Sequence, residues 1–476
     1  MSGFNYAKHD GLGLAKLVRQ KDVKPIELVD AAIERIERHN PALNAVIWTM
    51  FDRARDMAKK KLPDGPFKGV PFLLKDIMGH MEGAPNREGS RMMPPVAATF
   101  TSDLTARYLS AGLIPLGKTN VPEFGLVPTT ESKLYGPARN PWNPAHSTGG
   151  SSGGSGAAVA SGMVPMAHAN DGGGSIRIPA SACGLVGLKP TRARNPMGPQ
   201  VGDVMSGLAI DHIVCRSVRD AAAMLDATAG PAPGDPYAAP DGPKSWLAAC
   251  RKHPGKLRIA FATAQLDGAA FHPEVEAATR QAARLCRDLG HKVDEASPPV
   301  EAEQMIGAFM TLWTGGLAMQ IDMLSARTGQ KPGLKRLEGL TLGLYEAGKN
   351  VSAAQYLEAV ALLQGIARQV AAWHARYDVW ITPVLATPPM PIGTIDFNER
   401  DVMKGFAPIL GYVPFTPLQN ATGQPAIALP LHLSADGLPV GVQFVGRVGE
   451  EALLLQLART IEKAAPWKDR HPSIWD

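Results

Sequence analysis

The chain has 476 residues, of which 45% are hydrophobic and 20% are charged, a composition typical of a soluble globular protein. The net charge of +5 is small for this length and no long run of lysine and arginine occurs, which argues against nucleic acid as a partner. The first residues do not resemble a signal peptide and no run of about 18 apolar residues is present, so we expect a cytoplasmic protein with no membrane partner.

The hydrophobic pattern predicts helices and strands in alternation. The first clear helix begins after Pro25, carries apolar residues at helical spacing from Ile26 to Ile36, and is predicted to end at Asn40-Pro41. The pattern then predicts, in chain order, a strand at 68–77, a helix at 102–111, a strand at 113–118, a strand and a helix within 256–296, an almost wholly helical region at 300–377 with Ser352 as an N-cap, strands at 378–384 and 441–446, and a closing helix. This alternation predicts an α/β fold with a mixed, mostly parallel sheet covered on both faces.

We expect a single large domain over residues 1–476. No internal repeat is visible, and the proline-rich and glycine-rich segment 230–243 is interpreted as a long surface loop within that domain. The four cysteines are widely spaced and form no CxxC pair, which argues against a zinc site and a disulfide framework. We therefore expect no structural metal and four buried thiols.

Residues 112–119, GLIPLGKT, match the phosphate-loop pattern G-x-x-x-x-G-K-T in full. Their interior is bulky and apolar, and Pro115 lacks the N–H that a phosphate cradle would use. The following NVPEFG is also a poor start for the helix that the pattern requires. We interpret this segment as a strand, and a nucleotide-binding protein that uses Lys118 is the less favoured alternative.

A second pattern, G-x-S-x-G, fits at Ser151 and again at Ser152 within GGSSGG, as in the elbow of an α/β-hydrolase. That elbow needs a strand entering it, whereas RNPWNPAHSTGG predicts a loop; the small apolar run 157–169 would supply the helix that leaves it. His146 and His168 flank the region as candidate bases, although a lone histidine is more often a hydrogen-bonded structural residue. The elbow therefore stays open as an alternative.

Two loops of glycine and serine lie close together in the chain, GGSSGGSG at 149–156 and DGGGSIR at 171–177. Lys75 follows the apolar residues PFLL, and burial there would lower the pKa of its amine because desolvation disfavours the charged form. A neutral lysine can act as a base. The alternative is that Lys75 only pairs with a carboxylate such as Asp76 at the end of a strand.

Taken together, LLKD at 73–76, GGSSGG at 149–154 and ANDGGGSIRIPASACGLVGLKPT at 169–191 resemble the amidase signature family. The likeness extends over most of the chain through IPLGKTNVPEFG at 114–125, YGPARNPWNP at 135–144, NATGQPAIALP at 420–430 and GLPVGVQ at 437–443. The resemblance implies a single α/β domain, with a mixed central sheet surrounded by helices, and a Ser-cisSer-Lys catalytic group in place of Ser-His-Asp.

By this resemblance, Ser175 is the nucleophile, Ser151 is the bridging serine in a cis peptide, and Lys75 is the base. The resemblance also implies an acyl-enzyme that water then hydrolyses, with no metal or organic cofactor. The oxyanion hole would be formed by the backbone of Gly172, Gly173, Gly174 and Ser175. Asp171 and Arg177 are expected to brace this loop.

The chain departs from the family pattern at two places. Ala169-Asn170-Asp171 stands where the family often has Gly-Thr-Asp, which could alter the bracing of the oxyanion loop. Arg192-Ala193-Arg194 replaces the usual glycine-arginine after KPT, which weakens the match to the tRNA-amidotransferase A subunit. The segment 207–227 is more similar to the branch that holds 6-aminohexanoate oligomer hydrolases and aryl acylamidases.

We therefore predict a hydrolase of small or medium amides with apolar character. The alternatives are a carbamate hydrolase on the same residues and an amidotransferase subunit that acts in a complex. The helical region 300–377 is expected to contribute substrate-pocket walls, with core packing as an equal alternative, through Met305, Phe309, Met310, Trp313 and Met319. The motif leaves the natural amide open, and a homo-oligomer is allowed.

Overall fold

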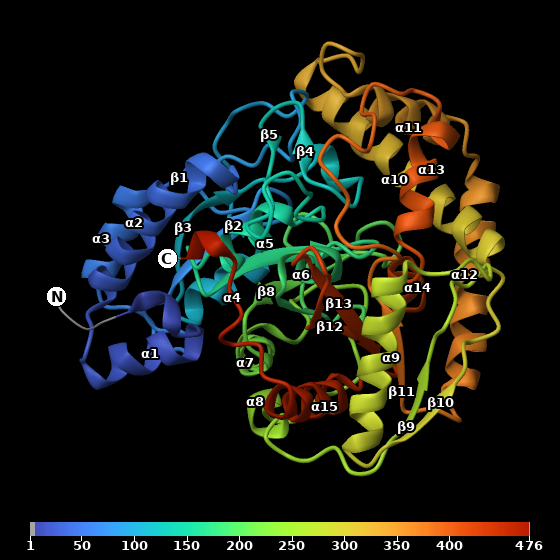
Figure 1. Ribbon diagram of the computed structural model, residues 1–476. Coiled ribbons are helices and arrows are strands. Elements are labelled where there is room, and N and C mark those ends of the chain that lie inside the picture. The colour runs from blue at the N-terminus through green and yellow to red at the C-terminus, as the bar shows by residue number, and fades with distance from the viewer. Residues whose placement is uncertain (1–4, 476) are drawn as a thin grey trace.

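A mixed β-sheet forms the centre of the computed structural model, which describes residues 5–475 (Figure 1). The strands of this sheet are β1 (Val46–Thr49), β2 (Pro71–Lys75), β3 (Ile114–Thr119), β6 (Met166–Asp171), β7 (Val186–Lys189), β8 (Ile210–Cys215), β9 (Arg258–Phe261), β10 (Lys292–Glu295), β11 (Val379–Pro383), β12 (Ala426–Leu433) and β13 (Pro439–Val445). Within the described residues these 11 strands have the order β1-β3-β2-β6-β8-β7-β12-β13-β11-β9-β10. Two short strands, β4 (Glu131–Ser132) and β5 (Gly136–Pro137), pair separately.

Strand direction in the sheet differs from the prediction. Parallel pairs occur in β3-β2-β6 and in β11-β9-β10, towards the two ends. The pairs in the middle, from β6 through β8, β7, β12 and β13 to β11, are all antiparallel. The expectation of a mostly parallel sheet is therefore wrong, because β7 to β8 and β12 to β13 are joined without the crossover helix that a parallel pair requires.

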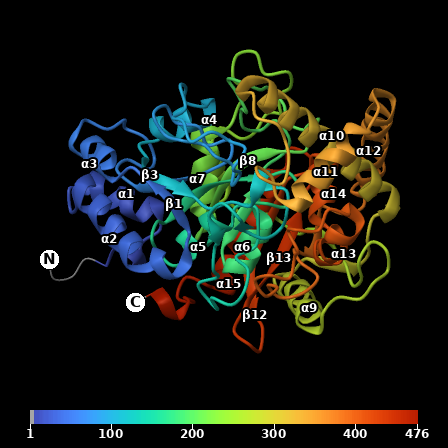
Figure 2. The ribbon, with the colours of Figure 1, turned by 90° about the horizontal axis from the view of Figure 1, so that it is seen from above.

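Helices surround the sheet (Figures 1 and 2). In Figure 1, α5 (Gly153–Ala160) and α6 (Arg177–Cys183) lie above the central strands, and α7 (Val218–Thr228), α8 (Trp246–Ala249) and α15 (Glu451–Ala464) lie below them. The blue N-terminal helices at one side are α1 (Gly11–Gln20), α2 (Pro25–Leu43) and α3 (Phe51–Lys59). The yellow to orange helices at the other side are α10 (Ala302–Thr328), α11 (Gly339–Lys349), α12 (Ala353–Trp373), α13 (Val402–Tyr412) and α14 (Thr416–Thr422). The remaining helical segments are α4 (Asp103–Ser110), α9 (Pro273–Asp288) and the short turns η1 (Tyr6–Lys8), η2 (Glu123–Gly125) and η3 (Ser473–Trp475).

Helix boundaries agree with the local sequence signals, with one exception. Ser352 caps α12 in a capping box, because its hydroxyl accepts from the Gln355 N–H at 3.2 Å and the Gln355 side chain accepts from the Ser352 N–H at 2.9 Å. Helix α2, however, continues past the predicted end at Asn40-Pro41 to Leu43. Pro41 lies in the last turn, where it removes only one intrahelical hydrogen bond, and so it does not end the helix.

Two further predicted segments have the expected structure. The segment 230–243 contains no helix or strand and is mostly exposed, as a surface loop should be. The segment GLIPLGKT forms β3 and is followed only by the single turn η2, so its interpretation as a strand is confirmed. The buried Lys118 amine donates to the Gly79 carbonyl at 2.5 Å and to Asn86 Oδ1 at 3.3 Å. It is therefore not available to a phosphate.

Two findings concern membrane and metal binding. Between residues 5 and 475, no helix is long and apolar enough to cross a membrane. Over the same range, no group of three or more His, Cys, Asp or Glu side chains is placed to hold a metal ion. The four cysteines are buried and form no disulfide with one another.

Candidate active site

Lys75 and the two glycine-serine loops meet at one edge of the sheet. Lys75 is the last residue of β2, and Asp171 is the last residue of the parallel strand β6. Parallel neighbours end at the same edge of a sheet, so the loop after β6, with Ser175, begins beside Lys75. Ser151 reaches this edge from the loop that leads into α5. The fold thus brings Lys75 against two loops that lie well beyond it in the chain.

The Lys75 amine is fully buried and forms two side-chain hydrogen bonds. Its Nζ lies 2.7 Å from Ser151 Oγ and also donates to Asn170 Oδ1. Asp76 faces other groups, since its carboxylate accepts from the Arg87 N–H at 3.0 Å and from the Tyr135 hydroxyl at 3.4 Å. The alternative in which Lys75 only pairs with Asp76 is therefore wrong.

Burial determines the protonation state of Lys75. Desolvation lowers the pKa of its amine to about 7, against the opposing pull of the carboxylates of Asp211, Asp171 and Glu88. A large fraction of the amine is therefore neutral near pH 7, and a neutral amine can accept a proton from the Ser151 hydroxyl.

The GGSSGG loop is glycine-rich because other backbone segments pass very close to it. A Cβ on Gly150 would lie 2.3 Å from the Thr129 carbonyl oxygen, and a Cβ on Gly154 would lie 2.3 Å from the Asn120 nitrogen. Neither approach leaves room for a side chain. The peptide between Gly150 and Ser151 is cis, the geometry that the family resemblance implies for the bridging serine.

The loop that carries Ser175 is held by a buried ion pair. Arg177 donates to both carboxylate oxygens of Asp171, at 2.9 and 3.0 Å, and both side chains are completely buried. Asp171 also accepts from the Ile176 N–H at 3.1 Å. Burial by itself would raise the pKa of Asp171, but the Arg177 charge and these hydrogen bonds lower it to about 2. The two residues thus form the bracing contacts expected of them.

One of the four predicted oxyanion donors is already engaged. The Gly174 N–H donates to Asp171 Oδ1 at 2.7 Å, so it cannot also face a developing oxyanion, and this part of the prediction is corrected. Gly174 itself is still required, because its φ is +134° and a Cβ would lie 2.3 Å from Thr416 Oγ1. Among the described residues, the N–H groups of Gly172, Gly173 and Ser175 have no hydrogen-bond acceptor.

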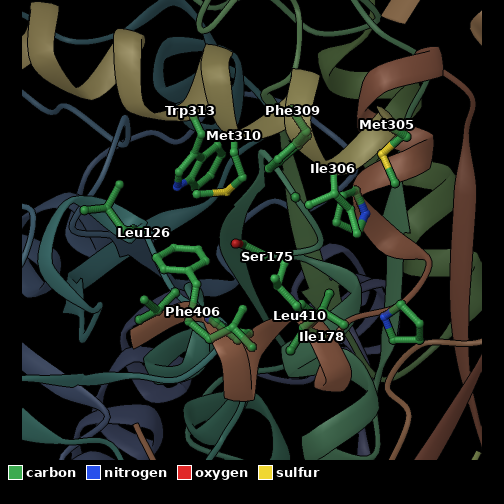
Figure 3. A pocket seen from close by; sticks show the side chains of 18 residues that line it. Leu126, Ser175, Ile178, Met305, Ile306, Phe309, Met310, Trp313, Phe406 and Leu410 are labelled. Atoms are coloured by element: carbon green, nitrogen blue, oxygen red, sulfur yellow. The ribbon is translucent and has the colours of Figure 1, made fainter. Parts of the chain in front are cut away.

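Ser175 opens into an apolar pocket (Figure 3). In Figure 3 the Ser175 hydroxyl points into the space between α10 and α13. Helix α10 contributes the predicted Met305, Phe309, Met310 and Trp313, together with Ile306. The remaining lining residues are Gly125, Leu126, Val127, Pro128, Gly173, Ile178, Phe406, Ile409, Leu410, Val413, Pro414 and Pro417.

Two features of this pocket differ from the sequence prediction. Met319, six residues after Trp313 and about 120° away from it around the helix, is 60% exposed and does not line the pocket. The wall on α13 was not predicted, although Phe406, Ile409 and Leu410 have the spacing of one helix face. That apolar periodicity is the signal that could have located the second wall.

The candidate histidines do not line the pocket. His168 is buried beneath Lys75, where its Nδ1 accepts from the Lys75 backbone N–H at 3.3 Å and its Nε2 lies 3.2 Å from Asp211 Oδ2. It is thus a hydrogen-bonded structural residue. The segment that leads into Ser151, residues 138–150, forms no strand longer than an isolated bridge, which removes the α/β-hydrolase elbow.

The chain is similar to proteins of one family over almost its whole length. The Amidase family model matches residues 27–455. A 6-aminohexanoate-cyclic-dimer hydrolase from Paenarthrobacter ureafaciens is 38% identical over 477 residues, which cover 98% of this chain and 96% of that protein. A solved 6-aminohexanoate cyclic dimer hydrolase in complex with its substrate superposes with a TM-score of 0.93 at 36% identity, over 99% of this chain and 100% of that chain. A bacterial aryl acylamidase of the amidase signature family superposes with a TM-score of 0.86 at 26% identity, over 96% of each chain.

Proposed function

Because the chain belongs to the amidase family and is a hydrolase of carbon–nitrogen amide bonds, we propose that it acts through an acyl-enzyme formed on Ser175, with Ser151 and Lys75 as the proton relay. The observation that carries this proposal is the 2.7 Å hydrogen bond between the buried Lys75 amine and Ser151 Oγ. It supplies a base and a bridging hydroxyl beside the Ser175 loop. A serine nucleophile needs such a base, because its hydroxyl is a weak nucleophile at neutral pH.

In the proposed reaction, Ser175 Oγ attacks the amide carbonyl and its proton passes to Ser151, whose own proton passes to neutral Lys75. The oxyanion is stabilised by backbone N–H groups of the Ser175 loop, each worth about 3 to 4 kcal/mol in the transition state. The relay then returns the proton to the leaving nitrogen, so that an amine departs and an ester to Ser175 remains. Water attacks that ester by the same steps in reverse order, which frees the acid and Ser175.

The substrate class that we propose is a neutral amide with apolar groups on both sides of the carbonyl. No lining residue of the pocket carries a charged side chain. A carboxylate or an ammonium group on the substrate would lose its hydration there without gaining a partner. The names of the relatives support this class, since a cyclic dimer of 6-aminohexanoate has no charged terminus and an aryl acylamide carries an apolar ring.

A serine-directed fluorophosphonate tests the nucleophile. We expect it to label the peptide that contains Ser175, and we expect the Ser175→Ala variant to lose both the labelling and the hydrolysis of a neutral anilide. Ser152→Ala is the matched control, because Ser152 is buried in the neighbouring loop and donates only to the Asn170 carbonyl at 3.3 Å. Labelling of another serine, or full hydrolysis by Ser175→Ala, would contradict the proposal.

The substrate class is tested with a panel that pairs each neutral amide with a charged analogue and with the corresponding carbamate. We expect the neutral amide to be preferred, and efficient carbamate cleavage would extend the activity to urethanes. Product analysis with added ammonia distinguishes hydrolysis by the isolated chain from amide transfer. A cytoplasmic location and a homo-oligomer stay predictions, which cell fractionation and mass measurement in solution can test.

A further inference from the structure

Asn170 contacts the proposed base directly. It is the residue before Asp171 in β6 and is only 8% exposed. Its Oδ1 accepts a hydrogen bond from Lys75 Nζ, and its Nδ2 donates to the Ile77 carbonyl at 3.3 Å. Lys75 Nζ therefore has two side-chain neighbours, Asn170 and Ser151.

The chemistry of the carboxamide determines which group donates. An amide oxygen can only accept, and the Ile77 carbonyl on the other side requires the NH₂ group of Asn170 to point towards it. The flipped amide would place an NH₂ group against the Lys75 amine and an oxygen against the Ile77 oxygen. The orientation of Asn170 is therefore defined by its surroundings, and Lys75 must donate to it.

A neutral amine has two N–H donors and one lone pair. If one N–H is held by Asn170 Oδ1, rotation about the Cε–Nζ bond of Lys75 is restricted, and the lone pair can face the Ser151 hydroxyl 2.7 Å away. We propose that Asn170 is a positioning residue for amide hydrolysis, which holds one N–H of Lys75 so that the amine lone pair faces the proton of Ser151. This inference rests on the proposed role of Lys75 as the base.

The neutrality of Asn170 also matters for the charge around the amine. Three carboxylates already attract a proton to Lys75, those of Asp211 on β8, Asp171 on β6 and Glu88 in the loop after β2. His168 on β6 lies against the Lys75 backbone, and its pKa is lowered mainly by burial and also by the charges of Lys75 and of Lys118 on β3. A carboxamide accepts the hydrogen bond without adding a fourth carboxylate, so it orients the amine without stabilising the ammonium form.

The Asn170→Asp variant separates orientation from charge, because aspartate has nearly the same shape. An added carboxylate in direct contact is expected to raise the pKa of Lys75 by about 1 unit or more. The acid limb of the kcat/KM profile should move to higher pH by the same amount, so that activity at pH 7 falls about fivefold or more and recovers at higher pH. Asn350→Asp makes the same change of charge at an exposed position, and the acid limb of its kcat/KM profile should coincide with that of the wild type.

A second variant covers the case in which Asn170→Asp does not fold. Asn170→Ala removes the acceptor without adding charge, and we expect kcat to fall on the order of tenfold at every pH while KM changes less than twofold. Rates are expressed per folded active site, titrated with the fluorophosphonate. An unshifted limb in folded Asn170→Asp, or a kcat for Asn170→Ala within twofold of the wild type, would overturn the inference.

The same measurements keep this inference apart from the proposed function. Wild-type hydrolysis that does not require Ser175 or Lys75 defeats the proposed function itself. If hydrolysis requires both residues but the Asn170 variants behave like the wild type, only the positioning role of Asn170 fails.

Discussion

Lowering the pH should inactivate the enzyme by protonating Lys75. The ordinary pKa of a lysine amine is 10.5, and burial lowers that of Lys75 to about 7. At pH 7 about half of the molecules would then hold the neutral base, compared with roughly one in 3,000 at the ordinary value. Since the charged form predominates below the folded pKa, kcat/KM should be about half its plateau value at pH 7, about tenfold below the plateau at pH 6 and about 100-fold below it at pH 5.

The assay measures kcat/KM from pH 5 to pH 9 with a neutral anilide, so that the substrate does not titrate. Each sample is returned to pH 8 and measured again, which separates protonation from unfolding. Glu88 titrates in the same range, because burial raises the pKa of its carboxyl to about 7. Its carboxylate also raises the pKa of Lys75, so Glu88→Gln should move the acid limb to lower pH and should not remove it.

Three substitutions test the loop and the pocket. Arg177→Met would leave the buried Asp171 carboxylate unpaired, so urea denaturation should show a loss of roughly 3 to 5 kcal/mol in the free energy of unfolding. Gly174→Ala would place a Cβ 2.3 Å from Thr416 Oγ1, and the resulting shift of the Ser175 loop should lower kcat on the order of 100-fold. Trp313→Ala removes a wall of the pocket beside Ser175, and kcat/KM for a bulky neutral anilide should fall about tenfold or more.

Each of these substitutions has a control of the same kind elsewhere in the chain. Arg280→Ala breaks an exposed ion pair with Glu276 and should change the free energy of unfolding by less than about 0.5 kcal/mol. Gly365→Ala in α12 adds a Cβ with no atom within 4 Å and should stabilise the helix by about 0.5 to 1 kcal/mol. Met319→Ala on the exposed side of α10 should leave kcat/KM unchanged.

Three outcomes would refute the reasoning behind these predictions. A flat pH profile down to pH 5, or an acid limb that disappears in Glu88→Gln, would remove Lys75 as the titrating base. Equal losses of stability in Arg177→Met and Arg280→Ala would show that the buried ion pair of Arg177 and Asp171 does not brace the loop. Equal values of kcat/KM for Trp313→Ala and Met319→Ala would show that the pocket does not bind the substrate.

Elements with a strong local signal could be predicted from the sequence. Each such signal lies within one turn or one strand of the element that it specifies. Examples are Ser352 at the start of α12, Pro25 at the start of α2 and the apolar run before Lys75 in β2. Strand direction could not be predicted in this way. It depends on which strands become neighbours, and β8 pairs with β6 and β7 through contacts that no local pattern records.

By itself, the sequence determined the composition of the site. Glycines mark positions where the backbone is crowded, as at Gly150, or has a positive φ, as at Gly174. Each position requires glycine for a local reason, so the glycines can be recognised in the sequence one at a time. Which side chains contact one another in the site was decided only by the tertiary structure. Lys75 contacts Ser151 and Asn170 and not the adjacent Asp76, because successive side chains at the end of a strand point in opposite directions. The pKa of its amine likewise depends on burial, which exists only once the sheet and helices have packed around it.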